Sequence, residues 1–480
     1  MDRADWLPPP SEDYQAEHPG WDTPVSEAAR TAPPAEAVPP EFADEALALR
    51  FSRRHANELR YVAAWGRWLI WDGKAWRFDE TLRAFDLARA VCREASAECE
   101  SNRVASAIAS AKTVASVERL AKSDRRHAAT VEQWDAEPWL LNTPEGIVDL
   151  RTGALGPHKP DVYMTKIAAV APGGGCPLWH QFLARITGGD LELQGFLQRV
   201  FGYALTGVTR EHALFFGYGT GANGKGTALN TMTGILGAYA AVAPMEVFVA
   251  SPGDRHPTEL AMLRGARLVA AQETEEGRQW AEARIKALTG GDPITARFMR
   301  QDFFTFSPQF KLFIAGNHKP GLRGVDEAIR RRLNLIPFTV TIPASERDAS
   351  LSDKLKAEWS GILAWAIQGC LEWQHRGLQP PSAVMAATAD YLSAEDSLAR
   401  WISERCRQIG YGGTECTALY QDWCRWMSAS GEHPGSQKRF SQALEAKGYQ
   451  KDPKARHATF IGIALDDVQR PFSETAEDRA

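Results

Sequence analysis

ALFFGYGTGANGKGT, residues 213–227, joins a short apolar run to a glycine-rich loop and then to the start of a helical pattern. The spacing Gly219-x4-Gly224-Lys225 is that of the P-loop, which binds nucleotide phosphates between a strand and a helix. Glycines let backbone N–H groups converge on a phosphate, and the N-terminus of the following helix adds partial positive charge. The stretch therefore predicts an α/β fold with a phosphate site.

The phosphate contacts are expected from the loop and the first helical turn. Lys225 is positioned to reach the β- and γ-phosphates of ATP as a point charge. The hydroxyl that normally holds Mg²⁺ directly follows this lysine, but Gly226 occupies that place and Thr227 comes one residue later. Thr227 is expected to bind Mg²⁺ directly or through water. The predicted nucleotide contacts are Gly219, Thr220, Gly221, Ala222, Asn223, Gly224, Lys225, Gly226 and Thr227.

An acidic segment follows the next apolar run. RLVAAQETEEG, residues 267–277, predicts a buried strand over 268–271 and then an acidic turn. A carboxylate at the C-terminal end of a parallel strand, beside the loop strand, would lie where Mg²⁺ and the attacking water are held. Glu273 is the first choice for this role and Glu275 the second. The alternative is a strand that ends in a solvated acidic turn.

A third apolar run, KLFIAGN, ends at Asn317. An amide at a strand end can hydrogen-bond the γ-phosphate or the attacking water and so report the nucleotide state. The segment GVDEAIRRRLNLIPF, residues 324–338, then places Arg330, Arg331 and Arg332 on a short helix before another strand. Such a run is commonly a solvated helix face. Beside a ring-forming ATPase, one of its arginines can serve the ATP of a neighbouring subunit.

These segments, in order, resemble the motifs of superfamily 3 DNA helicases. GTGANGKGT, RLVAAQETEEG, IKALTGGDPITARFM, KLFIAGNHKP and DEAIRRRLNLIPF are similar to motifs A, B, B′, C and the arginine finger. More narrowly, the chain resembles the P4-type phage/plasmid primase–helicases and the poxvirus D5-like group over roughly residues 50–465. The resemblance implies an AAA+-related P-loop ATPase core, hexameric rings, and ATP-driven movement along DNA, generally 3′ to 5′.

The resemblance also assigns roles by position. The phosphate, metal and water contacts would come from Lys225, Thr227 and Glu273, the sensor from Asn317, and the finger from Arg331 or Arg332. Two residues depart from the pattern. Gln272 stands where many members have a first acidic residue, so Glu273 would act alone, and Gly226 replaces the usual Ser or Thr.

DPITARFMRQDFFTFSP, residues 292–308, predicts two β runs, 294–299 and 303–306, with a turn near Arg300–Asp302. By resemblance this is the hairpin that projects into the channel of the ring. Lys286, Arg297 and Arg300 would then contact DNA phosphates, with aromatic neighbours bracing or stacking. The alternative is an ordinary surface hairpin.

The C-terminal region predicts helices near 397–408, 417–428 and 437–447, followed by two β runs that end at ATFIGIAL. This order resembles the winged-helix domain that follows the motor in the same family. Lys438 and Arg439 would begin the recognition helix, and Lys454 and Arg456 would lie in the wing on DNA. A winged helix used only for protein contact is the alternative.

Composition and charge divide the chain further. Residues 1–45 carry eleven acidic and two basic side chains and nine prolines, which predicts a disordered leader. We expect an α+β N-terminal domain of D5-like type over 46–175 and an ATPase domain with a preceding helical segment over 176–390. A winged-helix domain is expected over 391–465 and a disordered tail over 466–480. With a net charge of −5 overall, the body between the acidic ends is mildly basic.

Several classes are disfavoured by the sequence. No apolar run approaches eighteen residues, no signal peptide is recognisable, and the seven cysteines form no metal-binding pattern. We expect no membrane contact and a location in the cytoplasm of a bacterial host. A small-molecule kinase, which can share GKGT, is disfavoured because its loop lies near the N-terminus.

The sequence therefore predicts an ATP-dependent helicase of phage, prophage or plasmid replication. The expected partners are single-stranded and fork or origin DNA, further copies of the chain, most simply six, and a separate primase or polymerase, since no priming domain is recognisable. The alternative is an AAA+-like ATPase that loads or remodels replication proteins without unwinding DNA.

Overall fold

The computed structural model describes residues 39–250, 258–272, 277–298, 302–322, 325–431 and 434–466. The chain divides into two compact units. Unit 1 comprises the residues up to Ile70 and Phe78–Thr130, and unit 2 comprises Trp71–Arg77 and the residues from Val131 onward. Most of the predicted leader and tail lies outside the described residues.

Unit 1 is mainly helical. Its helices are α2 (Asp44–His55), α3 (Arg83–Glu98), α4 (Asn102–Ile108) and α5 (Ala111–Ala121). Strand β1 (Leu59–Val62) pairs antiparallel with β2 (Arg67–Trp71) and parallel with β4 (Ala128–Ala129). Ser110 caps α5 by accepting from the N–H of Thr113 and so separates it from α4.

Unit 2 begins with short strands and two helices. After β3 (Trp76–Phe78), strands β5 (Leu140–Thr143), β6 (Gly146–Asp149) and β7 (Ala154–Gly156) form an antiparallel meander. Helices α6 (Pro177–Ile186) and α7 (Leu191–Leu205) follow. α6 ends at Ile186, and Asp190 caps the start of α7, because its carboxylate accepts from the N–H of Leu193.

A five-stranded parallel sheet forms the centre of unit 2. Its strands are β8 (Leu214–Tyr218), β9 (Ala240–Val242), β10 (Leu268–Gln272), β13 (Lys311–Gly316) and β14 (Leu333–Pro337), in the spatial order β14-β8-β13-β10-β9. Every neighbouring pair is parallel. The expectation that β10 lies beside β8 is wrong, because β13 runs between them. After β8, the chain forms β9, β10 and β13 on one side of β8 and then β14 on its other side. The connections that follow β8 and β13 therefore leave in opposite directions, and the carboxyl ends of these two neighbouring strands form a topological switch point.

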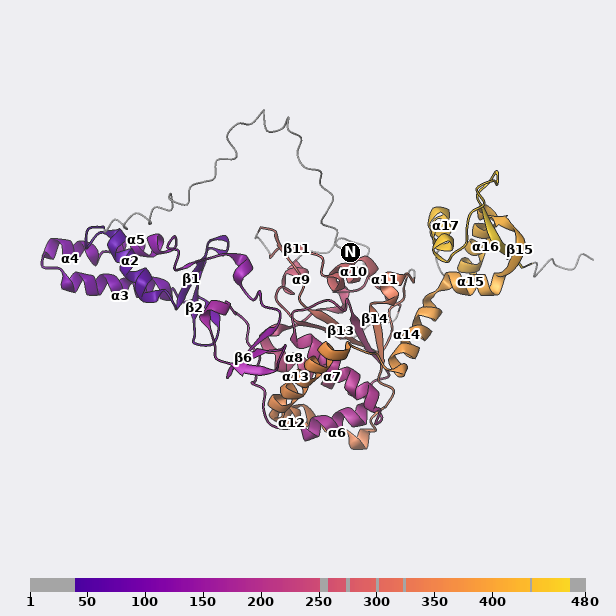
Figure 1. Ribbon diagram of the computed structural model, residues 1–480, viewed down its shortest axis with the longest axis horizontal. Coiled ribbons are helices and arrows are strands. Elements are labelled where there is room, and N and C mark those ends of the chain that lie inside the picture. Colours follow the sequence, from indigo (N-terminus) through magenta and orange to yellow (C-terminus); the bar gives the residue numbers. More distant parts are fainter. Residues whose placement is uncertain are drawn as a thin grey trace, which may run out of the picture. The chain divides into compact units, whose positions relative to one another are not determined.

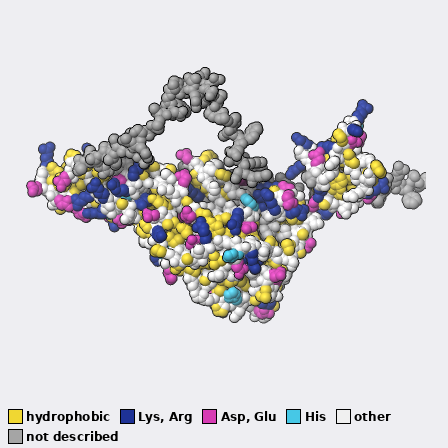
Figure 2. All heavy atoms as spheres, viewed as in Figure 1, with side chains coloured by type: hydrophobic (Ala, Val, Ile, Leu, Met, Phe, Trp, Pro, Cys, Tyr) yellow, Lys and Arg dark blue, Asp and Glu magenta, His cyan; other side chains and the backbone are white. Residues whose placement is uncertain are grey.

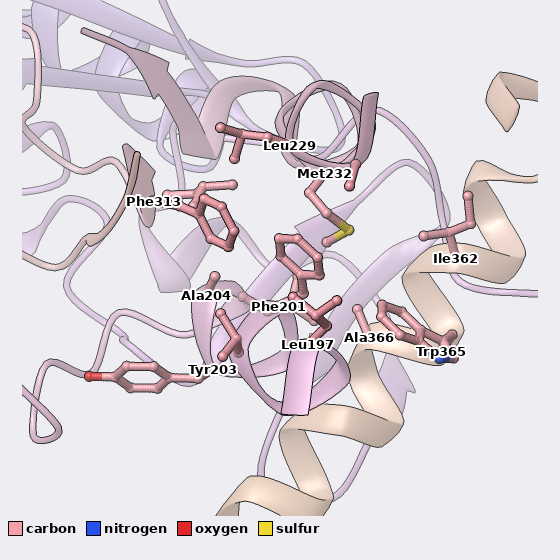
Figure 3. Packing of buried hydrophobic residues seen from close by; sticks show 14 of the residues in the cluster. Leu197, Phe201, Tyr203, Ala204, Leu229, Met232, Phe313, Ile362, Trp365 and Ala366 are labelled. Atoms are coloured by element: carbon pink, nitrogen blue, oxygen red, sulfur yellow. The ribbon is translucent and has the colours of Figure 1, made fainter. Parts of the chain in front are cut away.

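Helices cover both faces of this sheet, as expected for buried parallel strands. Neighbouring residues on each strand point to opposite faces, so Phe215 and Phe313 belong to one core and Phe216 and Ile314 to the other. The first core also contains α7, α8 (Lys225–Leu236) and α13 (Trp359–Arg376), where the ring of Phe201 stacks on that of Phe313 and also contacts Trp365 (Figure 3). Figure 1 shows these helices on one side of β13 and β14. The second core contains α10 (Glu282–Gly290) and α14 (Ser382–Glu395).

Shorter elements complete the central domain. They are α9 (Thr258–Ala261), the paired strands β11 (Ile294–Ala296) and β12 (Phe304–Phe306), α11 (Glu327–Arg330) and α12 (Leu351–Ala357). No described helix is long and apolar enough to cross a bilayer.

The C-terminal domain, residues 396–466, has a hydrophobic core of its own that includes Trp401, Leu419, Phe440 and Phe460. It contains α15 (Ser397–Arg405), β15 (Cys406–Glu415), α16 (Cys416–Ala429), α17 (Gln437–Ala446) and β16 (Thr459–Leu465). The three predicted helices are present, although the first ends three residues early because β15 begins at Cys406. β16 pairs antiparallel with β15.

Candidate functional site

The glycine loop, residues 219–224, connects β8 to α8 at the carboxyl edge of the sheet. Gly219 has φ +152°, and a Cβ there would lie 2.1 Å from the carbonyl oxygen of Phe338. Gly224 has φ +81° and caps α8. Both positions need glycine, since a side chain would be strained or would collide. The first turn of α8 carries no acidic residue, so its exposed N–H groups favour an anion.

A segment after β14 braces this loop. Asn223 is buried and donates to the carbonyl of Phe338 at 3.1 Å. The N–H of Ile342 donates to the carbonyl of Ala222 at 2.8 Å, and the hydroxyls of Thr220 and Thr341 lie 3.2 Å apart. Nothing in the sequence connects residues 338–342 with the loop, because PFTVTI is typical of a continuing strand.

Lys225 and Asn317 meet at the carboxyl edge of the sheet. The Nζ of Lys225 donates to the Oδ1 of Asn317 at 2.7 Å and to the carbonyl of Gly219 at 3.0 Å. Asn317 reaches this place because it directly follows β13, the neighbour of β8. Burial lowers the pKa of Lys225 from its usual value. Two residues that are 92 positions apart in the chain therefore share one polar contact at the loop.

Lys319 is a cation at this edge that the sequence analysis missed. Its Nζ lies 3.9 Å from the ring centroid of Tyr218, the last residue of β8, and burial lowers its pKa. Nothing marked it in the sequence, since a Lys-Pro pair after a strand is typical of a turn.

The candidate metal ligands are only partly described. Thr227 is half-buried in the first turn of α8, and Gln272 ends β10. Gln272 donates from its Nε2 to the Oδ1 of Asn230 at 2.6 Å. Glu273 and Glu275 lie outside the described residues. Within the described ranges, no group of three or more His, Cys, Asp or Glu side chains could hold a metal ion.

The arginine run splits into exposed and buried members. Arg330 and Arg331 are exposed, whereas Arg332 is buried. The guanidinium of Arg332 donates to the Oγ1 of Thr289 at 3.1 Å and to the carbonyl of Ala328 at 2.8 Å, and burial lowers its pKa. Arg332 is therefore the weaker of the two finger candidates, because it is buried and two of its guanidinium nitrogens donate within the domain. Exposed Arg331 is the stronger candidate.

The predicted hairpin carries aromatic rings at its end. β11 and β12 pair Ile294 with Phe306 and Ala296 with Phe304, so both strands are shorter than the predicted runs. Beyond them, the ring of Phe298 stacks on that of Phe304 at 5.5 Å, and the guanidinium of Arg297 lies over the exposed ring of Phe303 at 4.7 Å. An exposed ring with an adjacent cation suits base stacking and phosphate contact.

Two other predicted DNA contacts on and near the hairpin have different outcomes. Lys286 lies on α10 and forms an ion pair with Asp326, so its charge is neutralised within the domain. It is a weaker candidate than Arg297. Arg300 lies outside the described residues.

The C-terminal domain keeps its four predicted cations on the surface. Lys438 and Arg439 lie in the first turn of α17, and Lys454 and Arg456 lie in the segment before β16, all four exposed. On the face shown in Figure 2, Lys and Arg side chains stand at the end of the projection of this domain. An exposed cationic helix start and loop are suited to contact with a phosphate backbone.

Two families match parts of the chain. Residues 48–188 match the family described as "D5 N terminal like". Residues 217–332, which include the glycine loop and the arginine run, match a family of unknown function, DUF5906.

The curated relatives come from viruses. "Putative helicase L207/L206" of Acanthamoeba polyphaga mimivirus is 26% identical over 50% of this chain and 27% of its own length. "Putative helicase 022R" of Frog virus 3 (isolate Goorha) is 24% identical over 50% of this chain and 26% of its own length. A third, 184R of Invertebrate iridescent virus 6, is 30% identical over 31% of this chain and 16% of its own length. The chain thus spans about a quarter or less of these relatives.

A solved structure has a similar fold. "The A form apo structure of NrS-1 C terminal region-CTR(305-718)" aligns with 87% of this chain and 100% of its own, with a TM-score of 0.51 and 9% sequence identity. At this identity the similarity concerns the fold alone, a mixed α/β architecture.

Proposed function

We propose that this D5-like chain is an ATP-dependent DNA helicase of the superfamily 3 type that acts in phage, prophage or plasmid replication. The D5 N terminal like domain and the helicase names of the viral relatives support a primase–helicase role. The finer proposal is an AAA+-related P-loop core that hydrolyses ATP in an oligomeric ring, most simply a hexamer, and translocates on DNA.

The contact between Lys225 and Asn317 carries the proposal. These side chains meet above the carboxyl ends of two adjacent parallel strands, at the switch point where α/β sheets bind ligands. The glycine loop and the start of α8 provide an anion site at the same place. A triphosphate bound there would contact Lys225 with its charged oxygens and bring its γ-phosphate near Asn317.

The residues around the loop also suit Mg²⁺, which favours oxygen ligands. Thr227 and Gln272 bring oxygen donors to the first turn of α8, and we propose Glu273 as a further ligand or as the residue that orients the water. Bound with ATP, Mg²⁺ would neutralise charge on the phosphates. The ammonium of Lys225 would bind oxygens of the same phosphates.

Completion of the site requires a second subunit in this proposal. Arg331 is exposed at the end of α11, and we assign it the finger role toward the ATP of a neighbouring copy. A guanidinium supplied in trans stabilises the charge that develops during phosphoryl transfer. Turnover should then depend on protein concentration.

Two surfaces are proposed to contact DNA. Arg297 and Phe303 at the end of the β11–β12 hairpin would contact a single strand, and the exposed cations of the C-terminal domain would bind a duplex as a winged helix. A hairpin on the ATPase domain itself can follow the nucleotide state and so move the strand. If ATP turnover does not respond to DNA, the other candidate is favoured, an ATPase that remodels replication proteins.

The test compares ATP turnover with and without single-stranded DNA for the full chain and for Lys225→Ala. We expect low basal turnover, a clear increase with DNA, and near-complete loss in the variant, because Lys225 contacts the transferred phosphate. Turnover that is unaffected by DNA, together with no strand displacement, would support the remodelling ATPase. Full activity in Lys225→Ala would contradict the nucleotide site itself.

A further inference from the structure

The two departures from the usual nucleotide-site pattern, Gly226 and Gln272, lie next to each other in space. They are 46 positions apart in the sequence, one on the first turn of α8 and one at the end of β10. A Cβ placed on Gly226 would lie 3.6 Å from the Oε1 of Gln272, the one non-neighbouring atom within 4 Å among the described residues. The oxygen of Gln272 thus borders the space that a side chain at residue 226 would occupy.

A neighbouring amide binds the other end of Gln272. The Nε2 of Gln272 donates to the Oδ1 of Asn230 at 2.6 Å. Asn230 lies on α8, about one turn after Gly226, and so anchors the NH₂ group along the helix. The carbonyl oxygen is consequently the end that points toward Gly226.

Thr227 does not simply replace the missing hydroxyl. Successive residues of an α-helix are rotated by about 100° around its axis, so the side chain of Thr227 leaves α8 in a different direction from one at residue 226. A carbonyl oxygen, by contrast, is one of the oxygen ligands that Mg²⁺ prefers. The carbonyl oxygen of Gln272 already lies beside residue 226.

We propose that Gln272 is a magnesium ligand of the nucleotide site, with its Oε1 in place of the hydroxyl that Gly226 lacks, and that Asn230 orients it. The proposal rests on the nucleotide site of the proposed function and adds a residue to it. It also accounts for a glycine and a glutamine standing together where a hydroxyl and a carboxylate are usual, because the carbonyl oxygen of Gln272 lies beside residue 226 and a hydroxyl there is not required.

The test measures binding rather than turnover. The affinity of the full chain for a fluorescent ATP analogue is determined in excess Mg²⁺ and again in EDTA, and the ratio of the two dissociation constants gives the gain due to the metal. We expect Gln272→Ala to lower this gain by about tenfold, within the range seen when metal-site residues are removed, with the EDTA value unchanged. Gln272→Glu, which keeps an oxygen at the same reach, should retain the gain.

Two further variants sharpen the result. Gly226→Ser in the Gln272→Ala background should restore the gain, because a hydroxyl then occupies the usual place. Asn230→Ala should lower the gain less than Gln272→Ala does. An unchanged gain in Gln272→Ala, equal losses in Mg²⁺ and EDTA, or equal losses in Gln272→Ala and Gln272→Glu would overturn the proposal. If the wild type binds no ATP in either buffer, the proposed function fails and this inference falls with it.

Discussion

At the scale of single residues, Lys225 is the centre of the candidate site. Its ammonium donates to two neutral oxygens, those of Gly219 and Asn317. Phosphate oxygens are charged and form stronger hydrogen bonds, so a triphosphate would take Lys225 from Asn317. The amide of Asn317 would then be free to bind the γ-phosphate, which links its orientation to the nucleotide state.

Arg331→Ala and Arg332→Ala should behave differently although the residues are adjacent. Arg331 is exposed, so its loss should leave folding and ATP binding intact while lowering turnover by about 10³-fold or more, the contribution of a finger. Arg332 is buried and donates twice inside the domain, so its loss should cost about 1–3 kcal/mol of stability. Turnover, analogue binding and urea unfolding separate the two effects.

Mixing two variants provides the control for the proposal that Arg331 acts on the ATP of a neighbouring subunit. Lys225→Ala keeps Arg331 but lacks a working site, and Arg331→Ala keeps the site but lacks the finger. Mixing the two variants should recover part of the turnover, since hybrid rings contain complete sites. No recovery at any ratio would argue that Arg331 does not act on a neighbouring subunit.

At the scale of elements, the hairpin of β11 and β12 is the proposed contact with single-stranded DNA. Phe303→Ala should leave unfolding unchanged and weaken DNA binding by about tenfold, since stacking on an aromatic ring contributes about 1–3 kcal/mol per base. Met385→Ala on α14 is a matched control, because Met385 is 57% exposed and Phe303 59%. Equal DNA affinity of both variants, measured by fluorescence anisotropy, would remove Phe303 from the interface.

The sequence predicted the elements that local patterns determine. The glycine spacing and the strand end at Asn317 are both local, and the structure contains the loop and the strand. β15 was missed because CRQIGYGGTE contains three glycines and little apolar alternation, and its register shifts between Gln408 and Gly413.

Long-range pairing was beyond the reach of local patterns. The position of β13 between β8 and β10 depends on sheet topology, and the bracing of the glycine loop by residues 338–342 depends on backbone contacts that any sequence can make. The burial of Arg332 could not be read from three consecutive arginines. Such a run shows charge, whereas burial is decided by what packs on each side of α11.

At the scale of the whole molecule, the close approach of α7 and α13 supports the face of the sheet under the site. A Cβ on Gly202 would lie 2.1 Å from the backbone nitrogen of Cys370, so backbone rather than a flexible side chain stands in its way. Gly202→Ala should therefore destabilise the protein by about 1–3 kcal/mol, the cost of overpacking. Thermal unfolding checks this value.

Gly195→Ala on the same helix is the control for Gly202→Ala. Its Cβ would lie 3.3 Å from the Nη1 of Arg199, a side-chain end rather than backbone, although Arg199 is buried and donates to the carbonyls of Leu378 and Gln379. Alanine favours a helix by about 1 kcal/mol over glycine, so we expect a smaller loss of stability than in Gly202→Ala. Similar destabilisation by both substitutions would show that helix geometry, not the contact with α13, sets the cost.

The most direct test of the central claim is a structure of the full chain with Mg²⁺ and a non-hydrolysable ATP analogue. The account predicts the β- and γ-phosphates in the glycine loop, with the Nζ of Lys225 on their oxygens and the amide of Asn317 turned to the γ-phosphate. An analogue bound elsewhere, or bound at the loop with Lys225 and Asn317 still joined to each other and distant from the phosphates, would contradict it.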